Sequence, residues 1–246
     1  MHYDFNQPSR IVKLPKVLTE ISGLQCISKN RLACVQDEKA TVYFIDPKTG
    51  EIKNQLKFGK KGDFEGITLV NDVFYALRSD GRIYKLVSEK AQKFAFKKGS
   101  GFDFEGLCFD AKNNRLLVAC KEHGYGKLNK TNIYIYSFCL KTERYDKKAL
   151  FVLPRKLVGG HFQPSGIAQG SDGLIYVLSG YSRQLMVINE EGELQELVKL
   201  DLKEFIQAEG ICFGNKGELY ISNEGRSKRG NIMMFKRKGK SLELTR

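Results

Sequence analysis

The chain of 246 residues contains no tryptophan, only five prolines and only three histidines. No apolar run approaches the roughly 20 residues that a membrane-spanning helix needs, and the first twenty residues lack the apolar core of a signal peptide. The six cysteines form no Cys-x-x-Cys pair, which argues against a zinc site. A P-loop, a dinucleotide-binding glycine motif and a Gly-x-Ser-x-Gly nucleophile motif are also missing.

Positive charge is in excess, with 41 Lys and Arg against 28 Asp and Glu and a formal net charge of +13. Such a surplus suits an anionic ligand or a nucleic-acid backbone. The basic residues are spread over the whole chain, however, and no nucleic-acid-binding motif accompanies them. We therefore expect a solvated basic surface and no nucleic-acid partner.

A short motif occurs five times along the chain. It consists of a small or acidic residue, a glycine and an aliphatic residue, and its glycines are separated by 43, 40, 60 and 44 residues. These are Gly23, Gly66, Gly106, Gly166 and Gly210. Short β-branched and aromatic runs with turn residues between them follow each glycine, and helical periodicity is nearly absent. Four strands in about 40–45 residues are typical of a propeller blade.

The repeat predicts an all-β fold, a five-bladed β-propeller with four-stranded antiparallel blades, with six blades as the fallback. The run from Arg10 to Leu14 precedes its glycine as an outermost strand would, so we expect the N-terminal strand to close the last blade. The long third interval indicates two insertions, near 124–131 and 154–162. We expect one domain over 1–246, with residues 1–8 as a disordered or extended tail.

Three of the five motifs carry a glutamate, at Glu65, Glu105 and Glu209. Because the innermost strand of a blade lines the central channel, these carboxylates should converge at its mouth. Crowded carboxylates repel one another unless a proton or a cation neutralises them, and calcium accepts irregular coordination by six to eight oxygens. The alternative is that each glutamate caps local backbone donors.

Further carboxylates follow the second strands and should face the same mouth. Blades three and five each offer two carboxylates, so their four glutamates are the strongest candidate ligands, and two further residues are weaker ones. In that order the candidate calcium ligands are Glu105, Glu122, Glu209, Glu224, Glu65 and Asp37.

The arrangement resembles the SdiA-regulated (YjiK-like) proteins over roughly residues 9–236. The resemblance is carried by Asp103–Leu107, Gln163–Ile167, Gln207–Ile211 and Leu219–Glu224. It implies a five-bladed propeller, distantly similar to NHL-repeat propellers, with calcium at the channel mouth and no activity established for the family. It also suggests a bacterial cell-envelope location, although the anchor common in such proteins is absent from this chain; otherwise we expect a cytoplasmic protein.

Two classes of function are compatible with these residues. The first is a monomeric, calcium-bearing module that binds a small anionic ligand or a protein partner without chemistry. The second is a calcium-dependent hydrolase of the lactonase or phosphoesterase type, in which the metal polarises an oxygen of the substrate. Such an enzyme needs an acid or a base near the metal, and His123 is the best-placed histidine.

Overall fold

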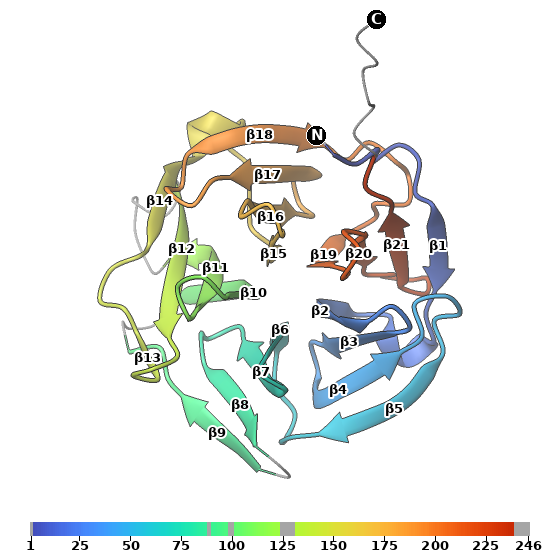
Figure 1. Ribbon diagram of the computed structural model, residues 1–246, viewed down its shortest axis with the longest axis horizontal. Helices are drawn as coiled ribbons and strands as arrows, with labels where there is room; N and C mark the ends of the chain where they lie inside the picture. Colours follow the sequence, from blue (N-terminus) through green and yellow to red (C-terminus); the bar gives the residue numbers. More distant parts are fainter. Residues whose placement is uncertain (1, 88–89, 98–100, 124–130, 239–246) are drawn as a thin grey trace, which may run out of the picture.

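The computed structural model is a ring of five antiparallel sheets, and it describes residues 2–87, 90–97, 101–123 and 131–238. The sheets are arranged radially, with the first strand of each blade nearest the central axis (Figure 1). The five-bladed propeller predicted by the repeat is therefore confirmed, and the six-bladed fallback is not needed.

The strands follow the repeat closely. Blade 1 contains β2 (Ile21–Ser28), β3 (Arg31–Gln36), β4 (Lys39–Ile45) and β5 (Ile52–Lys57). Blade 2 contains β6 (Phe64–Val70), β7 (Val73–Arg78), β8 (Ile83–Val87) and β9 (Lys90–Phe94). Blade 4 contains β15 (Gly166–Gln169), β16 (Ile175–Ser179), β17 (Gln184–Ile188) and β18 (Leu194–Lys199).

Blade 5 joins the two ends of the chain. It contains β19 (Ala208–Phe213), β20 (Leu219–Asn223), β21 (Asn231–Phe235) and the N-terminal β1 (Arg10–Lys13). Strand β1 pairs antiparallel with β21, in a register that places Arg10 opposite Met234. The prediction that the N-terminal strand closes the last blade is thus confirmed, and this closure ties the two ends of the ring together.

Blade 3 departs from the regular pattern in its outer strand. It contains β10 (Phe102–Asp110), β11 (Arg115–His123) and β12 (Asn132–Cys139), followed by β13 (Arg144–Tyr145) and β14 (Phe151–Pro154). Both β13 and β14 pair with β12, so together they occupy the fourth position. The insertion near 154–162 contains the 3-10 helix η3 (Arg155–Val158), while the one near 124–131 lies almost wholly outside the described residues.

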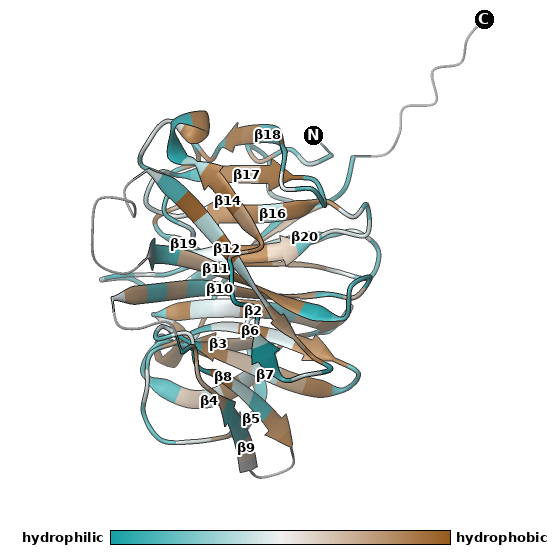
Figure 2. Ribbon diagram, turned by 90° about the vertical axis from the view of Figure 1, so that its left-hand side faces the viewer, coloured by the Kyte–Doolittle hydropathy of each residue, from teal (hydrophilic) through white to brown (hydrophobic). Residues whose placement is uncertain are grey.

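The hydrophobic core is divided into layers between neighbouring blades. Each of five clusters of buried residues contains side chains from two adjacent sheets, and apolar segments are concentrated in the strands (Figure 2). All six cysteines are free, and all but Cys139 are buried. None of the helices in the described part of the chain, which include η1 (Lys16–Leu18), has the length and hydropathy to span a bilayer.

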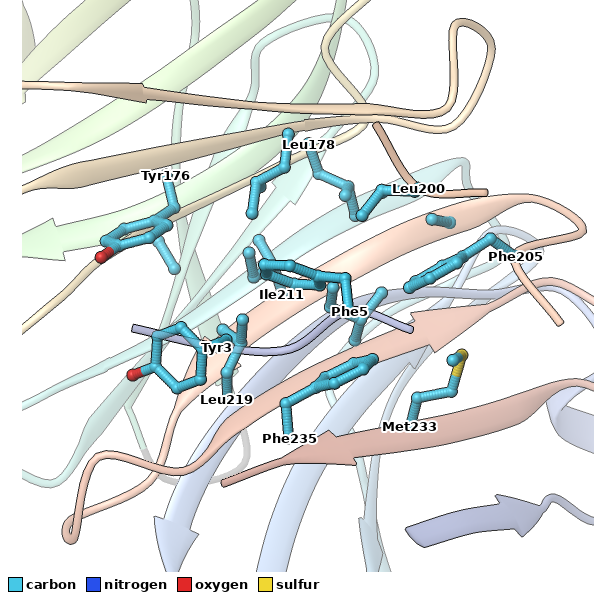
Figure 3. Packing of buried hydrophobic residues seen from close by; sticks show 14 of the residues in the cluster. Tyr3, Phe5, Tyr176, Leu178, Leu200, Phe205, Ile211, Leu219, Met233 and Phe235 are labelled. Atoms are coloured by element: carbon cyan, nitrogen blue, oxygen red, sulfur yellow. The ribbon is translucent and has the colours of Figure 1, made fainter. Parts of the chain in front are cut away.

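The N-terminal segment, expected to be a disordered or extended tail, forms no strand over residues 2–8 but packs on the core through two aromatic side chains. Tyr3 and Phe5 are each only 5% exposed and belong to the layer between blades 4 and 5. The Phe5 ring lies 5.1 Å from that of Phe235 (Figure 3). The Tyr3 hydroxyl donates a 2.8 Å hydrogen bond to the Gly217 carbonyl. These aromatic side chains anchor residues that precede the first strand.

The five repeat glycines allow the inner strands to approach one another. A Cβ on Gly23 would lie 2.7 Å from the Cα of Gly66, and one on Gly66 would lie 2.7 Å from the Cβ of Leu107. A Cβ would likewise come too close to the next blade at the other three positions: Gly106 faces Ile167, Gly166 faces Glu209 and Gly210 faces Ser22. A side chain at any of these five positions would collide with backbone or side-chain atoms of the next blade, so each position requires glycine.

Phe5→Ala should destabilise the protein by about 3 kcal/mol, because it removes a buried aromatic ring from the core. Ile11→Ala on β1 is the control, since Ile11 is 43% exposed and its truncation should change stability little. Urea unfolding followed by circular dichroism measures both. Equal stability of the Phe5 variant and the wild type would show that the segment does not contribute to the core.

Candidate functional site

Three inner strands bring the predicted glutamates together at the channel. Glu65 lies on β6, Glu105 on β10 and Glu209 on β19, and all three line a small cavity of about 10 Å³ with the five repeat glycines. This cavity is about the size of one water molecule. The converging inner strands narrow the channel at the level of these carboxylates.

In every repeat a second polar residue stands two positions before the residue that precedes the glycine, a pattern that the sequence analysis missed. These residues are Glu20, Asp63, Asp103, Gln163 and Gln207. Electrostatic interactions link Asp63 to Glu65 and Asp103 to Glu105. The alternation of acidic residues in Asp63-x-Glu65 and Asp103-x-Glu105 is the signal that would have identified it.

The pKa of Glu65 lies far above the usual range of a carboxyl group. Burial raises its pKa to about 11, with further contributions from the charge of Glu105 and from a hydrogen bond with Asp63. A hydrogen bond between two carboxyl groups requires a proton on one of them. Glu65 therefore keeps its proton at neutral pH and donates it in the hydrogen bond with Asp63.

Glu105 is paired with a lysine inside the acidic cluster. Its Oε1 accepts a 2.6 Å hydrogen bond from Lys121 Nζ, which also lies 3.8 Å from Asp103 Oδ2. Burial raises the pKa of Glu105 to about 7 despite the opposing charge of Lys121. Burial alone would lower the pKa of Lys121, but Glu105 and Asp103 outweigh it and the lysine stays charged.

Two further carboxyl groups at this mouth, those of Glu209 and Asp37, also have raised pKa values. Burial, followed by the charge of Glu105, raises the pKa of Glu209 to about 8. The pKa of Asp37 rises to about 6, first by burial and then by the charges of Glu20 and Glu224. The cluster comprises Glu20, Asp37, Asp63, Glu65, Asp103, Glu105, Glu209 and Glu224.

The remaining candidates lie near the ends of β11 and β20. Glu122 of β11 is exposed and lies opposite Asp103 in the β10–β11 register, and it interacts electrostatically with both Asp103 and Arg155. Glu224 follows β20 and interacts electrostatically with Glu209, as expected for a residue at this mouth. His123 ends β11 opposite Phe102, and its backbone position is all that the structure describes.

The donor chemistry of the cluster fits a hard cation, since every ligand offered is a carboxylate oxygen. One such oxygen, Oδ1 of Asp37, is buried without a hydrogen-bond partner. Within the described ranges no three His, Cys, Asp or Glu side chains already converge closely enough to hold a metal ion. A cation would therefore have to draw these side chains together and displace Lys121 from Glu105.

Comparison with known proteins places the chain in a family. The sequence matches the SdiA-regulated family over residues 8–226, which is most of its length. The chain belongs to the SdiA-regulated family. No curated protein matches it.

Solved structures resemble this SdiA-regulated protein at low sequence identity. Glutaminyl cyclase of Myxococcus xanthus is 12% identical with a TM-score of 0.67, covering 94% of this chain and 95% of its own. A luciferin-regenerating enzyme is 14% identical with a TM-score of 0.56, covering 96% of each chain. The PQQ-bound aldose sugar dehydrogenase of Streptomyces coelicolor is 14% identical with a TM-score of 0.56, covering 94% and 97%. These similarities extend to the fold alone.

The free energy of unfolding of the metal-free protein should fall as the pH rises from 5 to 9. Unfolded glutamates titrate near pH 4.3, whereas the pKa of Glu105 is raised to about 7 and that of Glu209 to about 8. The folded state thus binds more protons, and its advantage is lost as these groups ionise. Thermal melts with a chelator across this range measure the decline.

Glu65→Gln with Glu209→Gln should flatten this pH dependence, because a neutral amide replaces each carboxyl group. The control Glu191→Gln changes an exposed residue in the β17–β18 turn and should leave the slope unchanged. A flat profile in the wild-type protein would contradict the assignment of raised pKa values to the channel carboxylates.

Proposed function

We propose that this protein is a binding module whose channel-mouth carboxylates hold a divalent cation, calcium by ligand preference, and present it to an anionic ligand or partner. The observation that carries the proposal is the crowding of Glu65, Glu105 and Glu209 around one axis with raised pKa values. Such groups either keep their protons or share a cation.

The choice of calcium rests on the number and kind of donors. Eight carboxylates belong to the cluster, namely Glu20, Asp37, Asp63, Glu65, Asp103, Glu105, Glu209 and Glu224. Calcium tolerates irregular sets of six to eight oxygens, whereas magnesium demands a near-ideal octahedron. Glu65, Glu105 and Glu209 would form the centre of the site, with Asp37 and Glu224 supplying oxygens from the loops.

Lys121 acts as the internal competitor of the cation in this proposal. Its ammonium group already neutralises part of the cluster through Glu105 and Asp103. A bound cation would replace this charge and the protons held by the carboxyl groups. The affinity for the cation should therefore rise with pH, as the carboxyl groups lose their protons. The ion pair between Lys121 and Glu105 should lower it.

Calcium added to chelated protein at pH 7.5 should raise the melting temperature. The rise should reach roughly 5–10 °C when calcium is at about 100 times its dissociation constant. Glu105→Gln with Glu209→Gln should abolish it, and magnesium should produce a smaller shift. The absence of a calcium shift in the wild-type protein would refute the proposal.

Lys121→Met should tighten calcium binding by roughly tenfold, because it removes the competing positive charge from the cluster. The matched control Lys57→Met changes an exposed lysine of β5 and should leave the affinity unchanged. Calorimetric titration measures both dissociation constants. Weaker binding in the Lys121 variant would mean that the lysine helps to hold the ligand and is not a competitor.

The calcium-dependent hydrolase would use the same carboxylates and the same cation. Release of acid from lactone or phosphoester substrates, measured on the calcium-loaded protein, separates the two functions. The binding module predicts no turnover that depends on calcium, whereas the hydrolase predicts turnover that Glu105→Gln abolishes.

A further inference from the structure

A second charged site lies at the opposite end of the strands, where blades 5 and 1 meet. A pocket of about 360 Å³ is lined by residues of the β2–β3, β4–β5 and β19–β20 turns and of β1, β20 and β21. These turns are at the far ends of the strands whose other ends reach the channel carboxylates. The pocket is therefore on the face away from the proposed cation site and does not depend on it.

The lining of this pocket is strongly basic. Six of its residues are cationic and one, Glu218, is acidic; the cations are Arg10, Lys29, Lys48, Lys216, Lys236 and Arg237. The Glu218 carboxylate is held in its own turn, where Oε2 accepts a 3.1 Å hydrogen bond from the Lys216 amide. Of the six cations, only Arg237 has an ion pair within the described residues, a 3.9 Å contact with Asp172.

The six cationic residues surround a pocket whose base is formed by buried and partly buried residues. Pro47 and Tyr220 are buried, and Met234 is partly buried beside them. The volume is at the small end of the range for small-molecule sites. Five lysines and arginines that have no ion pair among the described residues line this pocket, so it offers several donors to an anion.

We propose that this pocket binds a small molecule carrying at least two negative charges, of the phosphate-ester or polyphosphate class. Lys29 and Lys48 approach it from blade 1, and Lys216 and Lys236 from blade 5. A polyphosphate group contacts both blades at once, so its binding bridges the boundary between blades 5 and 1, beside the closing strand β1. Charge-assisted hydrogen bonds from several lysines supply the affinity.

Inorganic pyrophosphate is the probe, titrated into the full chain by calorimetry in chelator at low ionic strength. The wild-type protein should bind it saturably with a stoichiometry near one. Lys29→Gln with Lys236→Gln should weaken binding by at least about tenfold, because each lysine supplies a charge-assisted contact. The control Lys57→Gln with Lys199→Gln removes two exposed lysines of outer strands and should retain wild-type affinity.

Three outcomes would overturn the proposal. One is the lack of saturable pyrophosphate binding by the wild-type protein, and another is an equal loss of binding in the test and control pairs. The third is that single-stranded oligonucleotides bind with the same dependence on Lys29 and Lys236 while pyrophosphate does not, which would assign the pocket to nucleic acid. Melting temperatures within a few degrees of wild type verify that both pairs are folded, and Glu105→Gln should leave pyrophosphate binding intact.

Discussion

The close approach of five inner strands is the constraint on which the rest of the structure depends. Each repeat glycine faces backbone or side-chain atoms of the next blade at a distance that excludes a Cβ, and the series returns from Gly210 to Ser22. Serine hydroxyls reinforce the same seams, as where Ser165 donates a 2.7 Å hydrogen bond to the Ala208 carbonyl of the next blade. Convergence of the strands brings the residue before each glycine to the axis, and in three blades that residue is glutamate.

The acidic mouth is therefore a consequence of ring closure that carries an energetic cost. Desolvation and mutual repulsion raise the pKa values of Glu65, Glu105 and Glu209, and Lys121 compensates only one of them closely. Ionised carboxylates in such surroundings are unfavourable without a counter-charge, and a bound cation supplies that charge as it displaces their protons. The excess positive charge of the chain lies elsewhere, partly in the basic pocket between blades 5 and 1.

The fold was predictable because its signal is repeated, whereas the errors concern single residues. Five copies of the glycine motif predicted the blades, and the spacing of Arg10–Leu14 predicted the closing strand. Tyr3 and Phe5 carry no periodic signal, and only the layer between blades 4 and 5 shows what they pack against. In the site, the ion pair between Lys121 and Glu105 was not predicted, because the short repeat motif does not show which side chain of β11 meets the glutamate of β10.

Proton release on calcium binding is the most direct test of a cation site made from protonated carboxyl groups. Calorimetric titrations at pH 7.5 in two buffers of different ionisation enthalpy count the protons released per calcium ion. Because the pKa of Glu209 is raised to about 8 and that of Glu65 to about 11, the account predicts release of about one proton or more. Calcium binding with no proton release, or no calcium binding at all, would contradict it.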